Sequence, residues 1–215
     1  MLRLDEISVP VRILEVGTGS GGIAHYFGTH ASGRFEVHAV DVFDSRVVRE
    51  GYEYQTVEGV ELPFPEDYFD VILTNHVIEH VGGRSEQLRH LSEIRRVMAN
   101  GGLGYLAVPN RWILVEPHFQ LALLSWLPRS WRSSYVRLRG RGACYDCEPL
   151  QLPELEGLLA SSGLRFKNMG TLALRVLLEI ERPGSAGDRI LRHVPDWPLD
   201  LFARLLPTLI YRLQK

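Results

Sequence analysis

The sequence predicts an α/β fold in which a mostly parallel sheet carries helices on both faces. Strand-like and helix-like segments alternate through the first half of the chain, which is the rhythm of a parallel sheet. A glycine-dense turn follows the first apolar segment, and an acid, Asp41, follows the second. The expected strands are 11–16, 35–40, 53–57, 69–74 and 103–108, and the expected helices are 21–30, 44–50 and 85–98.

Length and composition favour a single soluble domain. The chain has 215 residues, and its hydrophobic content of 45% is enough for a full core and an elaborated region beside it. A net charge of −2 argues against a general nucleic-acid binder, which would be basic. Asp5 and Glu6 near the start argue against a secretory signal, and no apolar run reaches the roughly 20 residues of a membrane-spanning helix.

The first expected strand runs into a turn rich in glycine. Glycine is needed where a strand turns sharply into a helix and the backbone must approach a ligand closely. Gly17, Gly19 and Gly22 fit the dinucleotide pattern G-x-G-x-x-G. Glu15, Gly17, Gly19 and Gly21 fit E-x-G-x-G-x-G, which resembles the first motif of class I S-adenosylmethionine methyltransferases.

Asp41 ends the second expected strand, about 20 residues after the glycine turn. Both kinds of cofactor fold place an acid there, where it accepts hydrogen bonds from ribose hydroxyls. Because the glycine turn precedes it, this role is favoured over that of a solvated carboxylate. Asp41 therefore supports a nucleoside cofactor but does not distinguish the dinucleotide pattern from the methyltransferase pattern.

Two later segments decide between the patterns. Leu62 to Val81 contains the run L-P-F-P-E-D-Y-F-D-V-I and an E-H pair, Glu79 and His80. Leu91 to Asn110 reads as a helix ending in R-V-M-A-N-G-G and a buried strand. Both closely resemble blocks of the methyltransferase family that includes the ubiquinone and menaquinone biosynthesis C-methyltransferases, although Asn100 stands where proline is usual. The resemblance implies the class I methyltransferase fold, a Rossmann-like seven-stranded sheet, with S-adenosyl-L-methionine as cofactor.

The resemblance also implies cofactor contacts at the ends of the first four strands. The glycine-loop amides would face the methionine part of the cofactor, and Glu15 would act through the loop. Glu58 and Gly59 follow the third strand, where the family contacts adenine, usually through an aspartate. The full expected set is Glu15, Gly17, Thr18, Gly19, Gly21, Asp41, Val42, Glu58, Gly59 and Asn75.

Two histidines are candidate general bases for an in-line methyl transfer, in which positioning supplies most of the catalysis. His76 follows the fourth strand, where the family's loop borders the transferred methyl; packing of the methionine tail is an equal alternative. His118 follows the fifth strand and leads towards the substrate region of related enzymes; a buried, hydrogen-bonded histidine is its alternative. His80 is expected to be structural and, with Glu79, to tie its loop to the next helix.

The two cysteines, Cys144 and Cys147, form a lone C-x-x-C. A zinc site needs further ligands, and a redox motif normally opens a helix after a strand. We therefore expect two structural thiols in a reducing cytoplasm and no metal site.

One domain is expected over 1–215, in three parts. These are a cofactor-binding core at 1–110, a substrate or lid insertion at 111–150, and C-terminal strands with an apolar helix at 151–215. A helix is expected at 153–162 and a strand at 163–167, while 172–181 fits either. Family members usually carry covering helices before the first strand, so 112–145 or a partner subunit is expected to form the lid.

The insertion predicts the class of acceptor. Residues 117–145 contain no acid but carry Arg129, Arg132, Arg137, Arg139 and Arg141, interleaved with Trp126, Trp131 and Tyr135. Such a run binds phosphate or carboxylate, or is a solvated loop. The apolar segments 119–128 and 199–213, with leucines near helical spacing, suit peripheral contact with a membrane. Core packing or a homodimer contact is the favoured explanation for them. We expect the acceptor to be a small molecule or a lipid-linked or phosphorylated sugar, and the location to be cytoplasmic, with the inner face of a membrane as the alternative.

Two other functional classes are disfavoured. A protein or nucleic-acid methyltransferase would be expected to carry (D/N)-P-P-(Y/F) where residues 75–78 read Asn-His-Val-Ile, so no nucleic-acid partner is expected. A non-catalytic S-adenosylmethionine-binding subunit would not need the intact Glu15, Gly17, Gly19 and Asp41. The pattern leaves O-, N- and C-methylation open.

Overall fold

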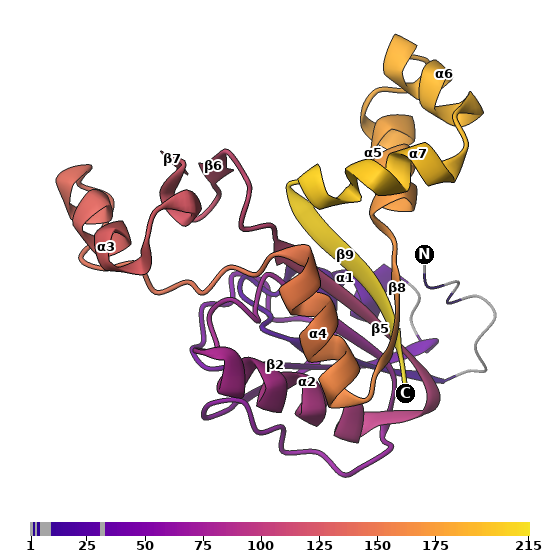
Figure 1. The fold of residues 1–215 in the computed structure, drawn as a ribbon. Helices are drawn as coiled ribbons and strands as arrows, with labels where there is room; N and C mark the ends of the chain where they lie inside the picture. The colour runs from indigo at the N-terminus through magenta and orange to yellow at the C-terminus, as the bar shows by residue number, and fades with distance from the viewer. Residues whose placement is uncertain (1, 3, 5–9, 31–32) are drawn as a thin grey trace.

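The computed structural model describes residues 2, 4, 10–30 and 33–215, and its centre is a seven-stranded, mostly parallel sheet (Figure 1). The strand order is β3-β2-β1-β4-β5-β9-β8, and β9 runs antiparallel to both neighbours. The strands are β1 (Val11–Val16), β2 (Phe35–Asp41), β3 (Glu53–Thr56), β4 (Phe69–Asn75), β5 (Met98–Pro109), β8 (Arg165–Asn168) and β9 (Thr208–Gln214). The expected strands of the first half are confirmed.

Helices cover both faces of the sheet, as its apolar strands require. Leu14 and Val16 of β1 pack into a large cluster with side chains of two helices, whereas Val11 and Ile13 pack into a smaller cluster on the other face. The helices α2 and α4 lie side by side over the first face, and α1 lies behind (Figure 1). These helices are α1 (Gly22–His30), α2 (Arg84–Val97) and α4 (Leu152–Ser162).

The expected helix at 44–50 is wrong, because this segment is a loop that supports the glycine turn. The amides of Val47 and Val48 both donate to the carbonyl of Ser20, at 3.0 and 3.1 Å. The Asp44 carboxylate accepts two hydrogen bonds from the Arg46 guanidinium. Residues two apart do not face each other on a helix, so this pairing favours the loop.

The insertion at 111–150 extends away from the sheet (Figure 1). It contains the hairpin strands β6 (Val115–Glu116) and β7 (Leu121–Ala122), the short 3₁₀ helix η2 (Leu124–Trp126) and α3 (Arg129–Leu138). The apolar segment 119–128, whose leucines lie near helical spacing, is therefore helical only over the single 3₁₀ turn of η2. Gln120 and Leu123 adopt φ of 55° and 56°, a left-handed conformation that an α-helix does not accommodate.

The C-terminal region differs in part from the prediction. Residues 172–181 lie in a helix, and the apolar segment 199–213 is helical only at its start, because its second half forms β9. Leu209, Tyr211 and Leu213 are buried while their neighbours are partly exposed, so the period is two, as in a strand. The helices are α5 (Gly170–Glu181), α6 (Ala186–His193), α7 (Asp196–Phe202) and the 3₁₀ helix η3 (Ala203–Leu205). None of the helices in the described part of the chain is long and apolar enough to cross a membrane.

Candidate functional site

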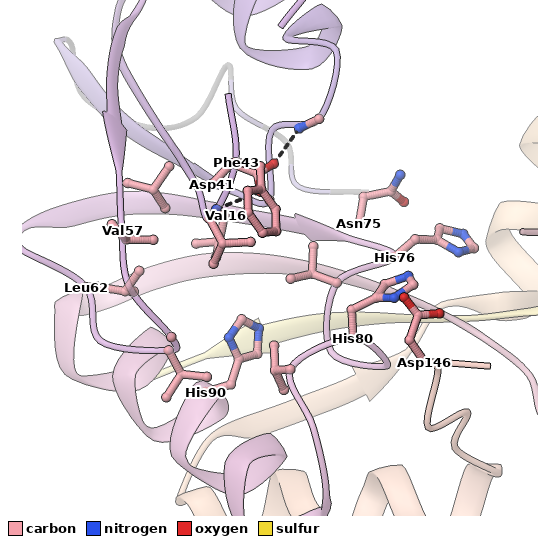
Figure 2. Close-up of a pocket in the computed structure, with 18 residues that line it drawn as sticks. Val16, Asp41, Phe43, Val57, Leu62, Asn75, His76, His80, His90 and Asp146 are labelled. Atoms are coloured by element: carbon pink, nitrogen blue, oxygen red, sulfur yellow. Dashed lines mark hydrogen bonds between the residues drawn. The ribbon is translucent and has the colours of Figure 1, made fainter. Parts of the chain in front are cut away.

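A cavity of about 600 Å³ opens where the carboxyl ends of β1, β2 and β4 meet, at the point where the strand order reverses (Figure 2). Open α/β sheets bind ligands at this point, in cavities of roughly 300–1,000 Å³. The predicted residues that line it are Gly17, Gly19, Asp41, Val42, Gly59, Asn75 and His76. The structure therefore brings most of the predicted set to one place.

The glycine turn has a left-handed backbone that only glycine adopts without strain. Gly17, Gly19 and Gly21 have φ of 76°, 49° and 85°. A Cβ on Gly17 would lie 2.3 Å from Val77 Cγ2, and one on Gly21 would lie 2.3 Å from the Tyr52 hydroxyl oxygen. Around Gly19, however, no described protein atom comes within 4 Å of a Cβ position. Gly19 lines the cavity, so its backbone is open to a ligand.

Glu15 holds the glycine turn from beneath. It is only 3% exposed, and its Oε2 accepts hydrogen bonds from the Thr18 hydroxyl (2.7 Å) and the Ala24 amide at the start of α1 (3.0 Å). Burial raises the pKa of this carboxyl, and the two hydrogen bonds oppose the rise. Glu15 and Thr18 are thus placed to act through the loop; their role towards a cofactor stays a prediction.

Asp41 connects the glycine turn to the loop after β2. Its Oδ2 accepts a hydrogen bond from the Gly19 amide (2.8 Å), and its Oδ1 accepts one from the Val42 amide (2.7 Å; Figure 2). Each carboxylate oxygen accepts more than one hydrogen bond, so Asp41 retains capacity for ribose hydroxyls. Val42 and the largely exposed Phe43, which was not predicted, line the cavity beside it.

The loop after β3 gives the cavity an apolar wall. Gly59 lines the cavity together with Val57, Val60 and Leu62. The exposed Glu58 is not a lining residue, so the structure does not bring this predicted side chain to the cavity. The apolar residues were missed because side chains in a loop have no periodic pattern to mark them.

The two candidate bases both lie close to one buried carboxylate. His76 follows β4 with φ of 59°, and its Nδ1 lies 3.6 Å from Glu79 Oε1. His118 comes from the insertion, and its Nε2 lies 3.5 Å from the same oxygen. Burial would raise the pKa of Glu79, but His118 and His76 outweigh it and the pKa is lowered. Glu79 in turn raises the pKa of His118, which lies outside the cavity lining.

Two further histidines line the cavity. His80, expected to be structural, lines it together with His76 (Figure 2). His90 projects from α2 and is fully buried, and burial lowers its pKa to about 4. His90 was not predicted, because a lone histidine within an amphipathic helix carries no signal.

The two cysteines differ in environment. Cys144 is exposed and Cys147 is buried, and both are free thiols. Cys147 Sγ lies 3.7 Å from His80 Nδ1, and burial raises the pKa of the thiol. The C-x-x-C segment thus places one sulfur atom beside the cavity-lining histidines.

Comparison with known proteins identifies the fold around this cavity. Residues 14–106 match a family model described as a methyltransferase domain. This part of the chain is therefore similar to a methyltransferase domain. It contains the glycine turn, Asp41 and His76, so the cavity belongs to that domain.

Individual relatives agree with the family match. A probable S-adenosylmethionine-dependent methyltransferase of Mycobacterium tuberculosis is 34% identical over 104 residues, covering 46% of this chain and 36% of that protein. A ubiquinone/menaquinone biosynthesis C-methyltransferase of Bordetella avium is 29% identical over 102 residues, covering 43% and 38%. The chain thus spans less than half the length of these curated relatives.

A solved structure shows that the likeness extends beyond the matched segment. The crystal structure of an S-adenosylmethionine-dependent methyltransferase from Mesorhizobium loti has a TM-score of 0.60, over 99% of this chain and 95% of that one. At 14% identity this shows a shared fold. The methyltransferase resemblance, the class I fold and S-adenosylmethionine as the family's cofactor are confirmed.

The geometry of the methyltransferase domain fits this cofactor. The open backbone at Gly19 can approach the methionine part, Asp41 can accept from the ribose, and the apolar wall around Val60 suits a flat base. Together with the similarity to methyltransferases, this fit favours S-adenosylmethionine over a dinucleotide.

Proposed function

We propose that this protein transfers a methyl group from S-adenosylmethionine to a phosphorylated, lipid-linked acceptor such as a lipid-linked sugar, at the cytoplasmic face of a membrane. The observation that supports methyl transfer is the cavity in which the open Gly19 backbone meets the Asp41 carboxylate. When bound there, S-adenosylmethionine would supply an electrophilic methyl group on a sulfonium sulfur.

The protein's own contribution is chiefly positioning. Gly19 and Asp41 would hold the methionine and ribose parts, and Asn75 and His76 border the opposite side of the cavity. Orientation of this kind contributes up to ~7–11 kcal/mol to lowering a barrier, whereas a general base adds roughly 10²–10⁴-fold in rate. His76, which lines the cavity, and His118, which contacts the same Glu79, are the candidate bases.

The helix α3 supports a lipid-linked acceptor. Trp131 and Leu138 on this helix are 64% and 83% exposed, and they line an apolar groove of about 470 Å³. Arg139 and Arg141 follow the helix and are exposed. Apolar and aromatic side chains beside guanidinium groups suit the interface of a membrane with anionic headgroups.

Not every arginine of this run is free to bind an acceptor. Arg132 is buried and donates to the carbonyls of Leu127 and Ser125. Arg129 pairs with Glu148. The proposal therefore relies on the exposed Arg139 and Arg141.

The proposed activity is tested by transfer of a labelled methyl group. The protein is incubated with labelled S-adenosylmethionine and either vesicles containing polyprenyl-phosphate sugars or soluble sugar phosphates. Label in the lipid fraction is expected, with a several-fold loss in the double variant Arg139→Ser, Arg141→Ser and none in the control Arg182→Ser. Label only in soluble acceptors would refute the lipid-linked acceptor, and cofactor binding without any transfer would favour a non-catalytic subunit.

We also propose that the insertion covers the cofactor. Of the insertion, only Asp146 lines the cavity. Closure would therefore require residues 112–145 to move towards it. Added S-adenosylhomocysteine should slow proteolysis within 112–145, and unchanged proteolysis would contradict a lid made by this region.

A further inference from the structure

The carboxylate of Glu79 is buried and lies within ion-pair distance of two histidines, but it makes no hydrogen bond to a described residue. Its side chain is 0% exposed, and neither oxygen has a hydrogen-bond partner within the described residues. Burying an unsatisfied carboxylate is costly, and such groups in native proteins are paired or coordinate a metal. The surroundings of Glu79 therefore need an explanation.

Two imidazole nitrogens lie near one oxygen of this carboxylate. His76 Nδ1 and His118 Nε2 are 3.6 and 3.5 Å from Glu79 Oε1, and one ligand atom from each of the three residues falls within 4.8 Å of the others. Tetrahedral zinc with bonds of about 2.0–2.1 Å separates its nitrogen and oxygen ligands by roughly 3.3 Å. The two nitrogen–oxygen distances thus lie a few tenths of an ångström from ligand spacing.

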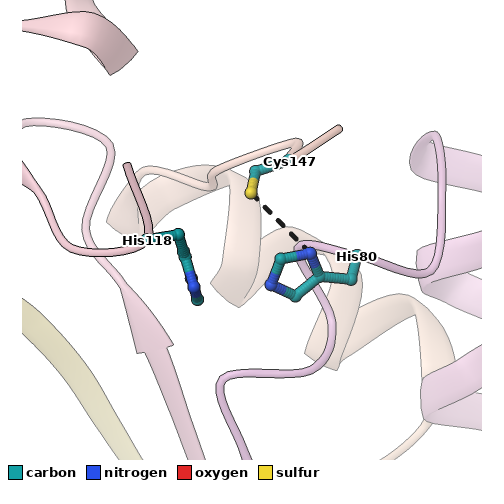
Figure 3. A group of neighbouring side chains, drawn as sticks. All are labelled: His80, His118 and Cys147. Carbon is teal, nitrogen blue, oxygen red and sulfur yellow. Dashed lines mark hydrogen bonds between the residues drawn. The ribbon is translucent and has the colours of Figure 1, made fainter. Parts of the chain in front are cut away.

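A second set of donor atoms shares His118. His80, His118 and Cys147 also bring their ligand atoms within 4.8 Å of one another (Figure 3). His80 Nδ1 lies 3.7 Å from Cys147 Sγ, and the rings of His80 and His118 meet edge to face at 4.7 Å. Imidazole, carboxylate and thiolate together are donors that suit zinc rather than calcium or magnesium.

We propose that His76, Glu79 and His118 bind a divalent transition metal of the zinc type, with His80 and Cys147 as the donors nearest to its fourth position. The ion would lie at the border of the cofactor cavity, because His76 and His80 line it. In the metal-bound protein His76 and His118 are ligands, so they would not act as the general bases considered under the proposed function. The binding step itself does not depend on methyl transfer.

The test measures metal binding by the full chain after treatment with a chelator and a thiol reductant. Zn²⁺ is titrated by calorimetry, and Co²⁺ is followed by its visible absorption, which reports tetrahedral coordination. One equivalent should bind. Loss of an outer-shell partner typically costs roughly 10–100-fold in affinity, so His118→Ala, which removes a ligand, should lose at least that much.

The variants separate a built site from adventitious binding. Glu79→Gln should also weaken binding, whereas His193→Ala and Cys144→Ser, which change an exposed histidine and the exposed thiol, should bind as the wild type does. His118 is partly exposed on a loop, so His118→Ala keeps the test valid if Glu79→Gln fails to fold. The proposal is overturned if the wild type binds no Zn²⁺, or if His118→Ala binds it with unchanged affinity. Titration of the same samples with S-adenosylhomocysteine reports separately on the proposed function.

Discussion

Gly19 provides the sharpest test of the cofactor site, because substitution there has two effects that can be measured separately. One is steric hindrance of the ligand, and the other is backbone strain in the protein. In Gly19→Ala the new methyl group would meet no described protein atom within 4 Å, so the only destabilisation expected comes from an alanine at a φ of 49°. A left-handed residue with a Cβ costs about 1–2 kcal/mol. For a chain of this size each kcal/mol lowers Tm by about 2–4 °C.

The same methyl group enters the cavity, so the expected effect on ligand binding is larger than strain alone explains. Contact between the cofactor and the Gly19 backbone should be lost, and the affinity for S-adenosylhomocysteine should fall at least roughly tenfold, or ~1.4 kcal/mol. Calorimetric titration measures this change, and thermal unfolding without ligand measures the strain.

Gly33 supplies a matched control. It has φ of 83°, and no described atom lies within 4 Å of its Cβ position, but it precedes β2 and does not line the cavity. Gly33→Ala should therefore lower Tm by a similar amount and leave the affinity unchanged. Wild-type affinity in Gly19→Ala, or an equal loss in both variants, would refute the assignment of this cavity to the cofactor.

Three further predictions address single contacts. In Asp41→Asn one of the two backbone donors loses its acceptor. The affinity for S-adenosylhomocysteine should therefore fall roughly 10-fold or more, and the free energy of unfolding measured in urea should fall by about 1–3 kcal/mol. Gly17→Ala places a Cβ 2.3 Å from Val77 at positive φ and should destabilise the protein by about 2–4 kcal/mol in the same assay; wild-type stability would contradict the clash. Burial lowers the pKa of His90 to about 4, so the unfolded chain binds the proton more readily and stability falls as pH decreases from about 6.5 to about 4. At about 1.36 kcal/mol per pKa unit the loss is about 3 kcal/mol, and His90→Leu should remove this part of the pH dependence.

The first half of the fold was predictable because local pattern and burial agree there. The strands β1 and β4 are apolar runs buried on both faces, and the glycine turn marks the end of β1. The wrong predictions of secondary structure lie where tertiary contacts determine the conformation. Residues 44–50 are held as a loop by Ser20, and β9 takes its period of two from pairing with β5. Neither partner is visible in the local sequence.

The cavity could be predicted from the sequence, whereas the histidine cluster could not. Gly19 follows β1 and Asp41 ends β2, which are neighbouring parallel strands. Because the carboxyl ends of such strands meet, order along the chain was enough to bring these residues together. His118 and Cys147 come from the insertion, outside the segment that matches the methyltransferase model, and no strand order places them. Only the path of the insertion brings them to Glu79 and His80. The geometry of the parallel sheet thus accounts for the glycine-turn side of the cavity, whereas the cluster of His118 and Cys147 with Glu79 and His80 depends on how this insertion folds back on the β4–α2 loop.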